Sequence, residues 1–293
     1  MSASPAPRSC LSVPGSSPRM LEKAVASAAD EVVIDLEDAV AADAKDAARE
    51  VVLAFLADVP VERRIAVRVN GVGTPWCHAD LIALGALARP PASVVVPKVE
   101  SPGDVAFVER LLTGVTGLPA GAGIRLQALV ESAAGLVAVE DIAASGASLE
   151  ALVLGYADLA ASLGRDPATA PWDPARERLL WAARAHGLRA VDGPHLGTGV
   201  DEAFHAGLSA AGRAGFDGKW VIHPQQLDAV NTAFSPDDAQ VDWAERVLAA
   251  LADGEQQGLG AVALDGAMLD EAVAVRARRL LDRHDLARAG VDR

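Results

Sequence analysis

The stretch Arg125–Leu136, RLQALVESAAGL, sets the pattern for the chain, because an apolar run there ends in a carboxylate and turns at once into a helix-like segment. A lone charge is costly among apolar side chains, so Glu131 needs a cation, a partner or water. The next apolar run, in LEALVLGYADLAASLG, repeats the pattern with Asp158 just past its end. Carboxylates at the ends of two neighbouring parallel strands would converge on one point. The spacing predicts a Mg²⁺ site, because this ion prefers oxygen ligands; two capping or salt-bridged carboxylates are the alternative.

Short apolar runs of this kind recur along the whole chain, and an Ala-rich helical pattern follows each of them, as expected of repeated β–α units. Their continuous apolar character is typical of strands buried on both faces. Eight such runs favour a closed (β/α)₈ TIM barrel over an open, doubly wound sheet. The first and seventh runs are the weakest. The runs cover residues 10–14, 32–36, 65–69, 93–97, 126–130, 151–155, 188–192 and 220–224.

Polar residues gather at the ends of these runs, where a barrel of this class carries its active site. Loops are polar in general, and this accounts for part of the pattern. It does not account for Arg68, which lies inside an otherwise apolar run. The polar residues in or just after the runs are Asp35, Glu37, Asp38, Arg68, Asn70, Lys98, Glu100, Glu131, Asp158 and His223.

The pattern divides the chain into a barrel, residues 1–234, and a C-terminal segment, residues 235–293. The segment contains an acidic amphipathic helix over 237–252, a Gly-rich stretch, and a basic helix over 270–284. Sixty or so residues are few for an independent core, so the segment is expected to pack on the barrel or on a neighbouring subunit. We interpret it as a lid.

The composition narrows the class of protein. A formal charge of −14 and 51% hydrophobic residues describe an acidic globular chain. Nucleic-acid and anionic-membrane surfaces need clustered Lys and Arg, so neither partner is expected. Only two cysteines are present, without zinc spacing. The first residues, MSASPAPRSC, contain no apolar signal core, and no run approaches the ~18 uncharged apolar residues of a membrane span. A cytoplasmic location is the expectation.

The chain has only four lysines against 22 arginines, so each lysine position is informative. Lys23 follows Arg19 by one helical turn at the start of the first predicted helix, where backbone N–H groups also favour anions. This pair predicts a phosphate site, with an ordinary helix start as the alternative. Lys98, at a strand end, is either a Schiff-base nucleophile of a metal-free aldolase or the partner of a nearby acid. His223 either contacts the site or has a structural role before Pro224.

Seven segments carry a family resemblance, and they occur in order over nearly the whole chain: RSCLSVPGSSPRMLEKA, DEVVIDLEDAV, AVRVNG, VVVPKVES, ALVESAAGL, GYADLAASLG and GFDGKWVIHPQQLDAVNTAFSP. Together they resemble the citrate lyase β-subunit-like family. This family contains the malyl-CoA and citramalyl-CoA lyases, and it lies within the wider class of Mg²⁺-dependent (β/α)₈ aldolases.

The resemblance implies a role for specific residues of the barrel. Glu131 and Asp158 would bind Mg²⁺, with Mn²⁺ as a possible substitute, and Arg68 would contact the oxygen of a 2-oxo acid. Glu37 and the other acids of DLEDAV would line the pocket and orient its basic groups.

The same resemblance assigns roles outside the strand ends. Arg19 and Lys23 would hold the phosphates of a coenzyme A thioester. In GAMLD, Asp270 would act as acid or base in the site of a neighbouring subunit. The protein is then expected to form a closed homo-oligomer, a trimer or a dimer of trimers.

The leading hypothesis is therefore a lyase that cleaves or forms a 3-hydroxyacyl-CoA such as malyl-CoA or citramalyl-CoA, with acetyl-CoA and a 2-oxo acid as the other reactants. A second is the β subunit of a citrate lyase, acting on citryl-acyl-carrier protein. A third, from a different class, is a non-catalytic barrel retained for binding.

Overall fold

The computed structural model describes residues 6–60, 62–256, 258 and 262–291. The chain forms two compact units, one over Arg8–Val230 and one that contains the residues from Asn231 onward together with the N-terminal residues before Arg8. The sequence placed this division near residue 234. Each unit is described by itself below.

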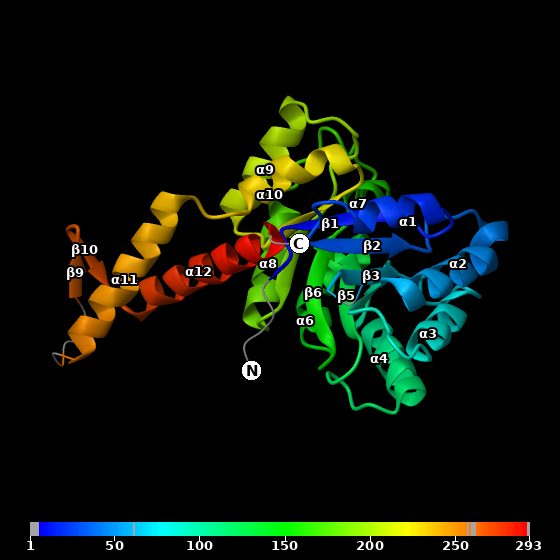
Figure 1. Ribbon diagram of the computed structural model, residues 1–293. Helices are drawn as coiled ribbons and strands as arrows, with labels where there is room; N and C mark the ends of the chain where they lie inside the picture. The colour runs from blue at the N-terminus through cyan, green and yellow to red at the C-terminus, as the bar shows by residue number, and fades with distance from the viewer. Residues whose placement is uncertain (1–5, 61, 257, 259–261, 292–293) are drawn as a thin grey trace. The chain divides into compact units, whose positions relative to one another are not determined.

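The larger unit is a closed barrel of eight parallel strands, in which every strand pairs with the next along the chain and β8 pairs with β1 (Figure 1). The predicted (β/α)₈ fold is confirmed, and the two weakest runs form strands like the others. The strands are β1 (Ser9–Pro14), β2 (Glu31–Asp35), β3 (Arg64–Arg68), β4 (Ser93–Val96), β5 (Arg125–Val130), β6 (Leu149–Leu154), β7 (Arg189–Asp192) and β8 (Gly218–Val221).

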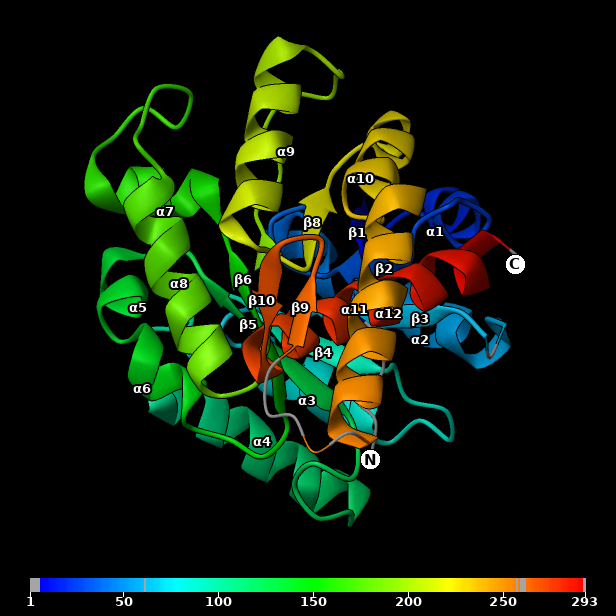
Figure 2. The same ribbon diagram turned by 90° about the vertical axis from the view of Figure 1, so that its left-hand side faces the viewer.

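Helices connect these strands and lie outside them, as Figure 2 shows for the segment from α3 to α9. No helix in the described part of the chain is long and apolar enough to cross a membrane. The helices of this unit are α1 (Pro18–Val25), α2 (Lys45–Asp58), α3 (Cys77–Gly85), α4 (Pro102–Thr116), α5 (Ala133–Val137), α6 (Val139–Ala143), α7 (Tyr156–Leu163), α8 (Asp173–Ala185) and α9 (Glu202–Ala214), with the short 3₁₀ turns η1 (Ala42–Ala44) and η2 (Pro224–Gln226). The boundary between the units, after Val230, falls within α10 (Leu227–Ala233).

The barrel core explains why the strand sequences are continuously apolar. Helices cover the outer face of each strand, and side chains from the other strands cover its inner face, so neither face is in water. Every residue of β2 and β4 is buried. Each fully buried Val or Leu contributes about 1.5–3 kcal/mol relative to an exposed one. One central cluster takes a side chain from each strand: Cys10, Val33, Ala66, Val95, Leu129, Val153, Val191 and Trp220.

The N-terminal ends of the strands hold a polar network that links neighbouring strands and also joins β5 to β2 across the barrel interior. Arg64 Nε donates to Glu31 Oε1 at 2.7 Å, and Gln127 Nε2 donates to the same carboxylate and to Ser93 Oγ. Because these buried groups satisfy one another, they hold strands in register. This end of a barrel carries stability, so the chemistry is to be sought at the opposite end.

The second unit contains α11 (Asp238–Gln256), the antiparallel strands β9 (Val262–Leu264) and β10 (Ala267–Leu269), and α12 (Glu271–Val291). Both predicted helices are present. The hairpin was not predicted, although its turn, Asp265-Gly266, has positive φ at both residues, and Asp-Gly is a strong signal for such a turn. A small buried cluster, which includes Ala244 and Leu269, joins the helices to the hairpin.

Candidate active site

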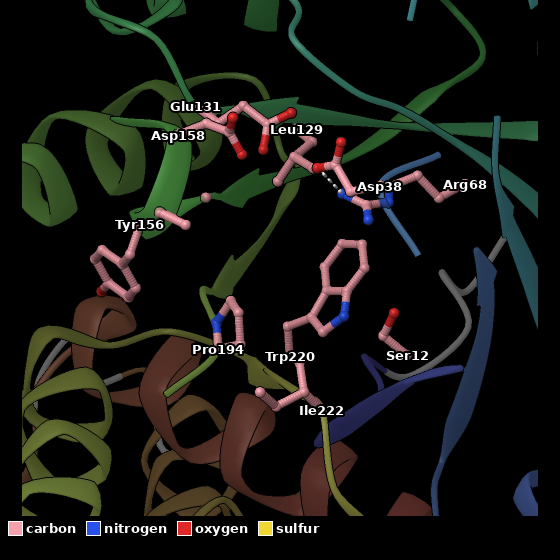
Figure 3. A pocket seen from close by; sticks show the side chains of 12 residues that line it. Ser12, Asp38, Arg68, Leu129, Glu131, Tyr156, Asp158, Pro194, Trp220 and Ile222 are labelled. Carbon is pink, nitrogen blue, oxygen red and sulfur yellow. Dashed lines mark ion pairs between the residues drawn. The ribbon is translucent and has the colours of Figure 1, made fainter. Parts of the chain in front are cut away.

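A cavity of about 180 Å³ opens at the C-terminal ends of the barrel strands (Figure 3). One side carries charged groups from Asp38, Arg68, Glu131 and Asp158. Leu129 lies among these groups, and the facing side is mainly apolar, with Pro194, Trp220 and Ile222. Such a combination of an apolar wall and a few convergent charged groups is typical of a binding site for a small polar ligand.

The two predicted metal ligands lie next to each other in this cavity. Glu131 follows the last residue of β5 and is 3% exposed, and Asp158 is half-buried in the first turn of α7. Figure 3 shows their carboxylates side by side. Gly155, at the end of β6, lets the two segments approach: a Cβ there would lie 2.6 Å from Glu131 Cβ and 2.7 Å from its Oε2.

The charge balance around Glu131 fits a cation. Burial, and after it the negative charges of Glu37 and Asp158, raise the pKa of Glu131 to about 8 against the opposing effect of Arg68. Glu131 Oε1 already accepts a hydrogen bond from the backbone N–H of Lys98 at 2.9 Å. Two adjacent carboxylates with free oxygens suit Mg²⁺, which commonly takes one or two protein carboxylates and leaves other positions to substrate and water.

We expect Gly155→Ala to displace Glu131, because the added Cβ has no room beside it. Overpacking of this kind typically costs about 1–3 kcal/mol, and the displaced carboxylate should also weaken divalent-cation binding. Gly212→Ala in α9 is the matched control, since a Cβ there meets nothing within 4 Å. Thermal unfolding and a Mn²⁺ titration of both variants test this; equal cation affinity in the two would contradict it.

Arg68 is held in the cavity wall by acids of the β2 end. Its Nε lies 2.8 Å from Asp35 Oδ1 and its Nη2 lies 2.5 Å from Asp35 Oδ2, a bidentate pair that fixes the guanidinium plane. Nη1 lies 2.9 Å from Glu37 Oε2 and 3.7 Å from Asp38 (the dashed line in Figure 3). Burial opposes the charge, but the bond to Asp35 and the acids nearby raise the pKa of Arg68 above its ordinary value, so it remains a cation.

Glu37 lies behind Arg68 and is 6% exposed. Its carboxylate pairs with Lys98, and burial raises its pKa although Arg68 and Lys98 oppose the shift. Lys45 donates to the backbone oxygens of Leu36 and Glu37 at 2.9 and 2.7 Å, which anchors the loop that carries these acids.

Lys98 does not have the character of a Schiff-base nucleophile. Burial would lower the pKa of its ammonium, but the hydrogen bond and charge of Glu37 outweigh this and raise the pKa above its ordinary value. A lysine that attacks a carbonyl needs a depressed pKa so that the free amine is populated. The geometry therefore favours the paired alternative for Lys98.

A buried network that sequence reasoning missed supports the first turn of α7. The Tyr156 hydroxyl donates to Asp192 and accepts from Arg176 Nε at 2.7 Å, while Lys219 Nζ lies 2.5 Å from Asp192. These groups come from α7, α8, β7 and β8. The network fixes Tyr156, two residues before Asp158. The only sequence signal was Lys219, one of the four lysines, in a buried strand.

The other predicted residues do not line this cavity. Arg19 and Lys23 are exposed on α1 and have no ion-pair partner in the part of the chain that the structure describes. Asp270 is exposed in the second unit, where its Oδ1 accepts from Val273 N at 3.1 Å at the start of α12. His223 Nδ1 accepts from Gln225 N at 3.3 Å, which is the structural role that the sequence left open.

Fold and cavity together define the class: a (β/α)₈ barrel whose strand ends hold an acid pair suited to a divalent cation, beside a fixed arginine. Residues 8–224 match the family described as HpcH/HpaI aldolase/citrate lyase. The chain belongs to this family, and it is a carbon–carbon lyase by that membership.

Individual relatives cover almost the whole chain. It is 34% identical to an L-malyl-CoA/beta-methylmalyl-CoA lyase of Rhodobacter capsulatus, over 94% of this chain and 93% of the relative. It is 39% identical to a (3S)-malyl-CoA thioesterase of Cereibacter sphaeroides over the same shares of the two chains. Among solved structures, CitE from Mycobacterium tuberculosis in complex with magnesium, acetoacetate and coenzyme A has a TM-score of 0.74 and 35% identity, covering 96% of this chain and 98% of that one.

Proposed function

We propose that this protein is a Mg²⁺-dependent lyase that cleaves or forms a 3-hydroxyacyl-CoA such as malyl-CoA or citramalyl-CoA, with acetyl-CoA and a 2-oxo acid as the other reactants. The observation that carries the proposal is the pair of adjacent carboxylates, Glu131 and Asp158, in one cavity with Arg68. The relatives named as malyl-CoA enzymes and the CitE complex with magnesium and coenzyme A support it.

The donor set of the site fits the ion. When bound by Glu131 and Asp158, Mg²⁺ would supply Lewis-acid polarisation of substrate oxygens, to which the carboxylate and hydroxyl of a malyl group are well suited. Arg68 then has a separate task. Its guanidinium is already fixed by Asp35, so it can donate to the oxygen that becomes the carbonyl of the 2-oxo acid without reorganising.

Cleavage requires that the 3-hydroxyl lose its proton, that the C2–C3 bond break, and that the bonding electrons pass to the acyl thioester as an enolate. The enolate must then take up a proton to give acetyl-CoA. Glu37 keeps Arg68 and Lys98 in place around this reaction. We assign the proton delivery to Asp270 of a neighbouring chain in a closed homo-oligomer, a trimer or a dimer of trimers.

The coenzyme A part of the substrate would meet Arg19 and Lys23. Both cations are exposed on α1, and neither is engaged by an acid within the described residues. A cytoplasmic location completes the proposal. Cys10 and Cys77 are both buried as free thiols, which suits a reducing compartment.

Product analysis tests the function directly. The full chain is incubated with Mg²⁺, acetyl-CoA or propionyl-CoA, and a panel of 2-oxo acids that includes glyoxylate and pyruvate, and the thioesters are identified by mass spectrometry. A new 3-hydroxyacyl-CoA is the expected product. No new thioester from any pair would contradict the proposal and favour the acyl-carrier-protein or non-catalytic alternative.

Thioester hydrolysis is a second candidate, because the thioesterase relative has 39% identity to this chain. It predicts different products from the same substrate: malyl-CoA would give malate and free coenzyme A instead of glyoxylate and acetyl-CoA. Free thiol and 2-oxo acid measured in one reaction separate the two activities. Thiol release without 2-oxo acid would assign the protein to the thioesterases.

Metal affinity should depend on pH. Burial and the neighbouring acids raise the pKa of Glu131 to about 8 in the metal-free protein, so below that pH a divalent ion must displace a proton. Affinity is thus expected to fall as pH decreases below 8, by up to about tenfold per pH unit, and to level off above it. Mn²⁺ titrations followed by electron paramagnetic resonance between about pH 6.5 and 8.5 measure this, and a flat profile would contradict it.

Asp270 is tested by mixing two inactive variants. Asp270→Asn should lower kcat by ~100-fold or more if it delivers the proton, and Glu131→Gln should remove the metal site. When the two chains are unfolded and co-assembled in equal amounts, roughly a quarter of wild-type activity should return, because a working site then combines a barrel from one chain with Asp270 from the other. Mixed oligomers that remain inactive would exclude action across an interface.

A further inference from the structure

Lys98 follows β4 directly and has a backbone conformation that its residue type disfavours. Its φ is +52°, and only one other non-glycine residue in the described part of the chain has a positive φ. A side chain with a Cβ is strained in this left-handed region, which glycine or asparagine enters more easily. Strained residues of this kind persist only where surrounding contacts hold them, and they concentrate at functional sites.

The contacts of Lys98 run in two directions. Its backbone N–H donates to Glu131 Oε1 at 2.9 Å, while its ammonium pairs with the Glu37 carboxylate and lies 3.5 Å from Asp38 Oδ1. Glu37 is itself fixed by the Arg68 guanidinium, 2.9 Å from its Oε2. The ion pair is thus linked to a guanidinium that Asp35 holds by two hydrogen bonds, and it can hold Lys98 in the strained conformation that aims the N–H at Glu131.

The two oxygens of Glu131 are therefore not equivalent. Oε1 is occupied by the Lys98 N–H, whereas Oε2 lies on the side of Gly155, where a Cβ would approach it to 2.7 Å, at the start of the helix that carries Asp158. Figure 3 shows the Glu131 and Asp158 carboxylates as neighbours.

We propose that Lys98 is a positioning residue: its left-handed backbone, held by the ion pair with Glu37, fixes Glu131 so that Oε2 alone faces Asp158 and the divalent cation. The inference rests on the proposed metal-dependent function and goes beyond it, because it assigns a coordinating atom and the residue that selects it. Ligand carboxylates are commonly oriented by such second hydrogen bonds, whose loss costs ~10- to 100-fold in metal affinity.

Two variants separate the effect of the backbone conformation of residue 98 on metal binding from the effect of its side-chain charge. Lys98→Gly and Lys98→Met both remove the ammonium and both keep the N–H, but only glycine adopts the left-handed conformation without a partner to hold it. Lys98→Gly should bind Mn²⁺ within about threefold of wild type, and Lys98→Met ~10- to 100-fold more weakly. A loss caused by charge alone would weaken both equally, and this result would overturn the inference.

A second measurement does not depend on the metal. In metal-free protein, hydrogen exchange of the residue 98 amide should be slow in wild type and in Lys98→Gly, because the N–H is bonded to Glu131, and fast in Lys98→Met. Equal exchange in the two variants would also overturn the inference. If wild type binds no Mn²⁺ while the exchange difference is present, the proposed function fails and the positioning of Glu131 by Lys98 is upheld.

Discussion

Glu131→Gln is expected to abolish metal-dependent activity while leaving the metal-free protein folded. Burial and neighbouring acids raise the pKa of Glu131 to about 8, so at pH 7 this side chain is largely protonated without metal and glutamine closely mimics it. The amide oxygen can still accept the Lys98 N–H. What the variant lacks is a charged oxygen beside Asp158, and kcat should fall ~1,000-fold or more.

The measurement pairs kinetics with thermal unfolding. Mg²⁺ stabilises only a protein that binds it, so millimolar Mg²⁺ should raise the Tm of wild type and not of Glu131→Gln, whereas the two metal-free Tm values should agree closely. Glu140→Gln is the control, because Glu140 is an exposed acid on α6 that pairs with Arg178. A Glu131→Gln protein that retains activity after complete metal removal would eliminate the metal mechanism altogether.

The barrel was predictable from the sequence because a strand that is buried on both faces has a continuously apolar sequence. Eight continuous apolar runs followed by helical patterns admit few other folds, and even the short run that became β7 was sufficient. The acid pair was predictable for a related reason. A carboxylate at the end of an apolar strand, repeated at the next strand, indicates either a shared site or two capping or salt-bridged carboxylates, and the structure brings Glu131 and Asp158 into one cavity.

Contacts between distant segments were not predictable, because no local pattern records them. Arg68 was identified as unusual, yet its bidentate pairing with Asp35 depends on the register of β2 against β3. The support of α7 by Tyr156 and Asp192 depends likewise on the closure of the barrel. The left-handed backbone of Lys98 has no sequence signal, since lysine is not a residue that predicts positive φ.

The four lysines show how composition becomes informative once the structure is known. In a chain that uses arginine almost everywhere, Lys45, Lys98 and Lys219 each bind a carboxylate or backbone oxygens at the strand ends around the site. Lys23, which is exposed on α1, has no acid partner among the described residues. A compact ammonium donates in three directions from one point, which suits the anchoring of loops better than a planar guanidinium does.

Arg68→Ala is expected to damage both stability and catalysis. Asp35 is 1% exposed and Glu37 is 6% exposed, so removal of the guanidinium leaves two buried acids without their main cation. Breaking one side of a buried ion pair typically costs about 3–5 kcal/mol, whereas Arg178→Ala, which breaks the exposed pair with Glu140, should cost about 0–1 kcal/mol. Urea unfolding of both variants measures the difference.

Replacing both partners of the ion pair, Asp35 and Arg68, separates the effect on catalysis from the effect on stability. The double variant Asp35→Asn, Arg68→Ala no longer buries an unpaired charge at Asp35, so it should regain much of the lost stability. It should not regain activity, because the guanidinium that Arg68 supplies to the cavity is still missing, and kcat/KM should stay ~1,000-fold below wild type. Arg68→Lys should also remain poorly active, since an ammonium cannot reproduce the bidentate bond to Asp35 that aims the guanidinium. A stable double variant with near wild-type kcat/KM would remove Arg68 from the reaction and leave it a purely structural partner of the β2 acids.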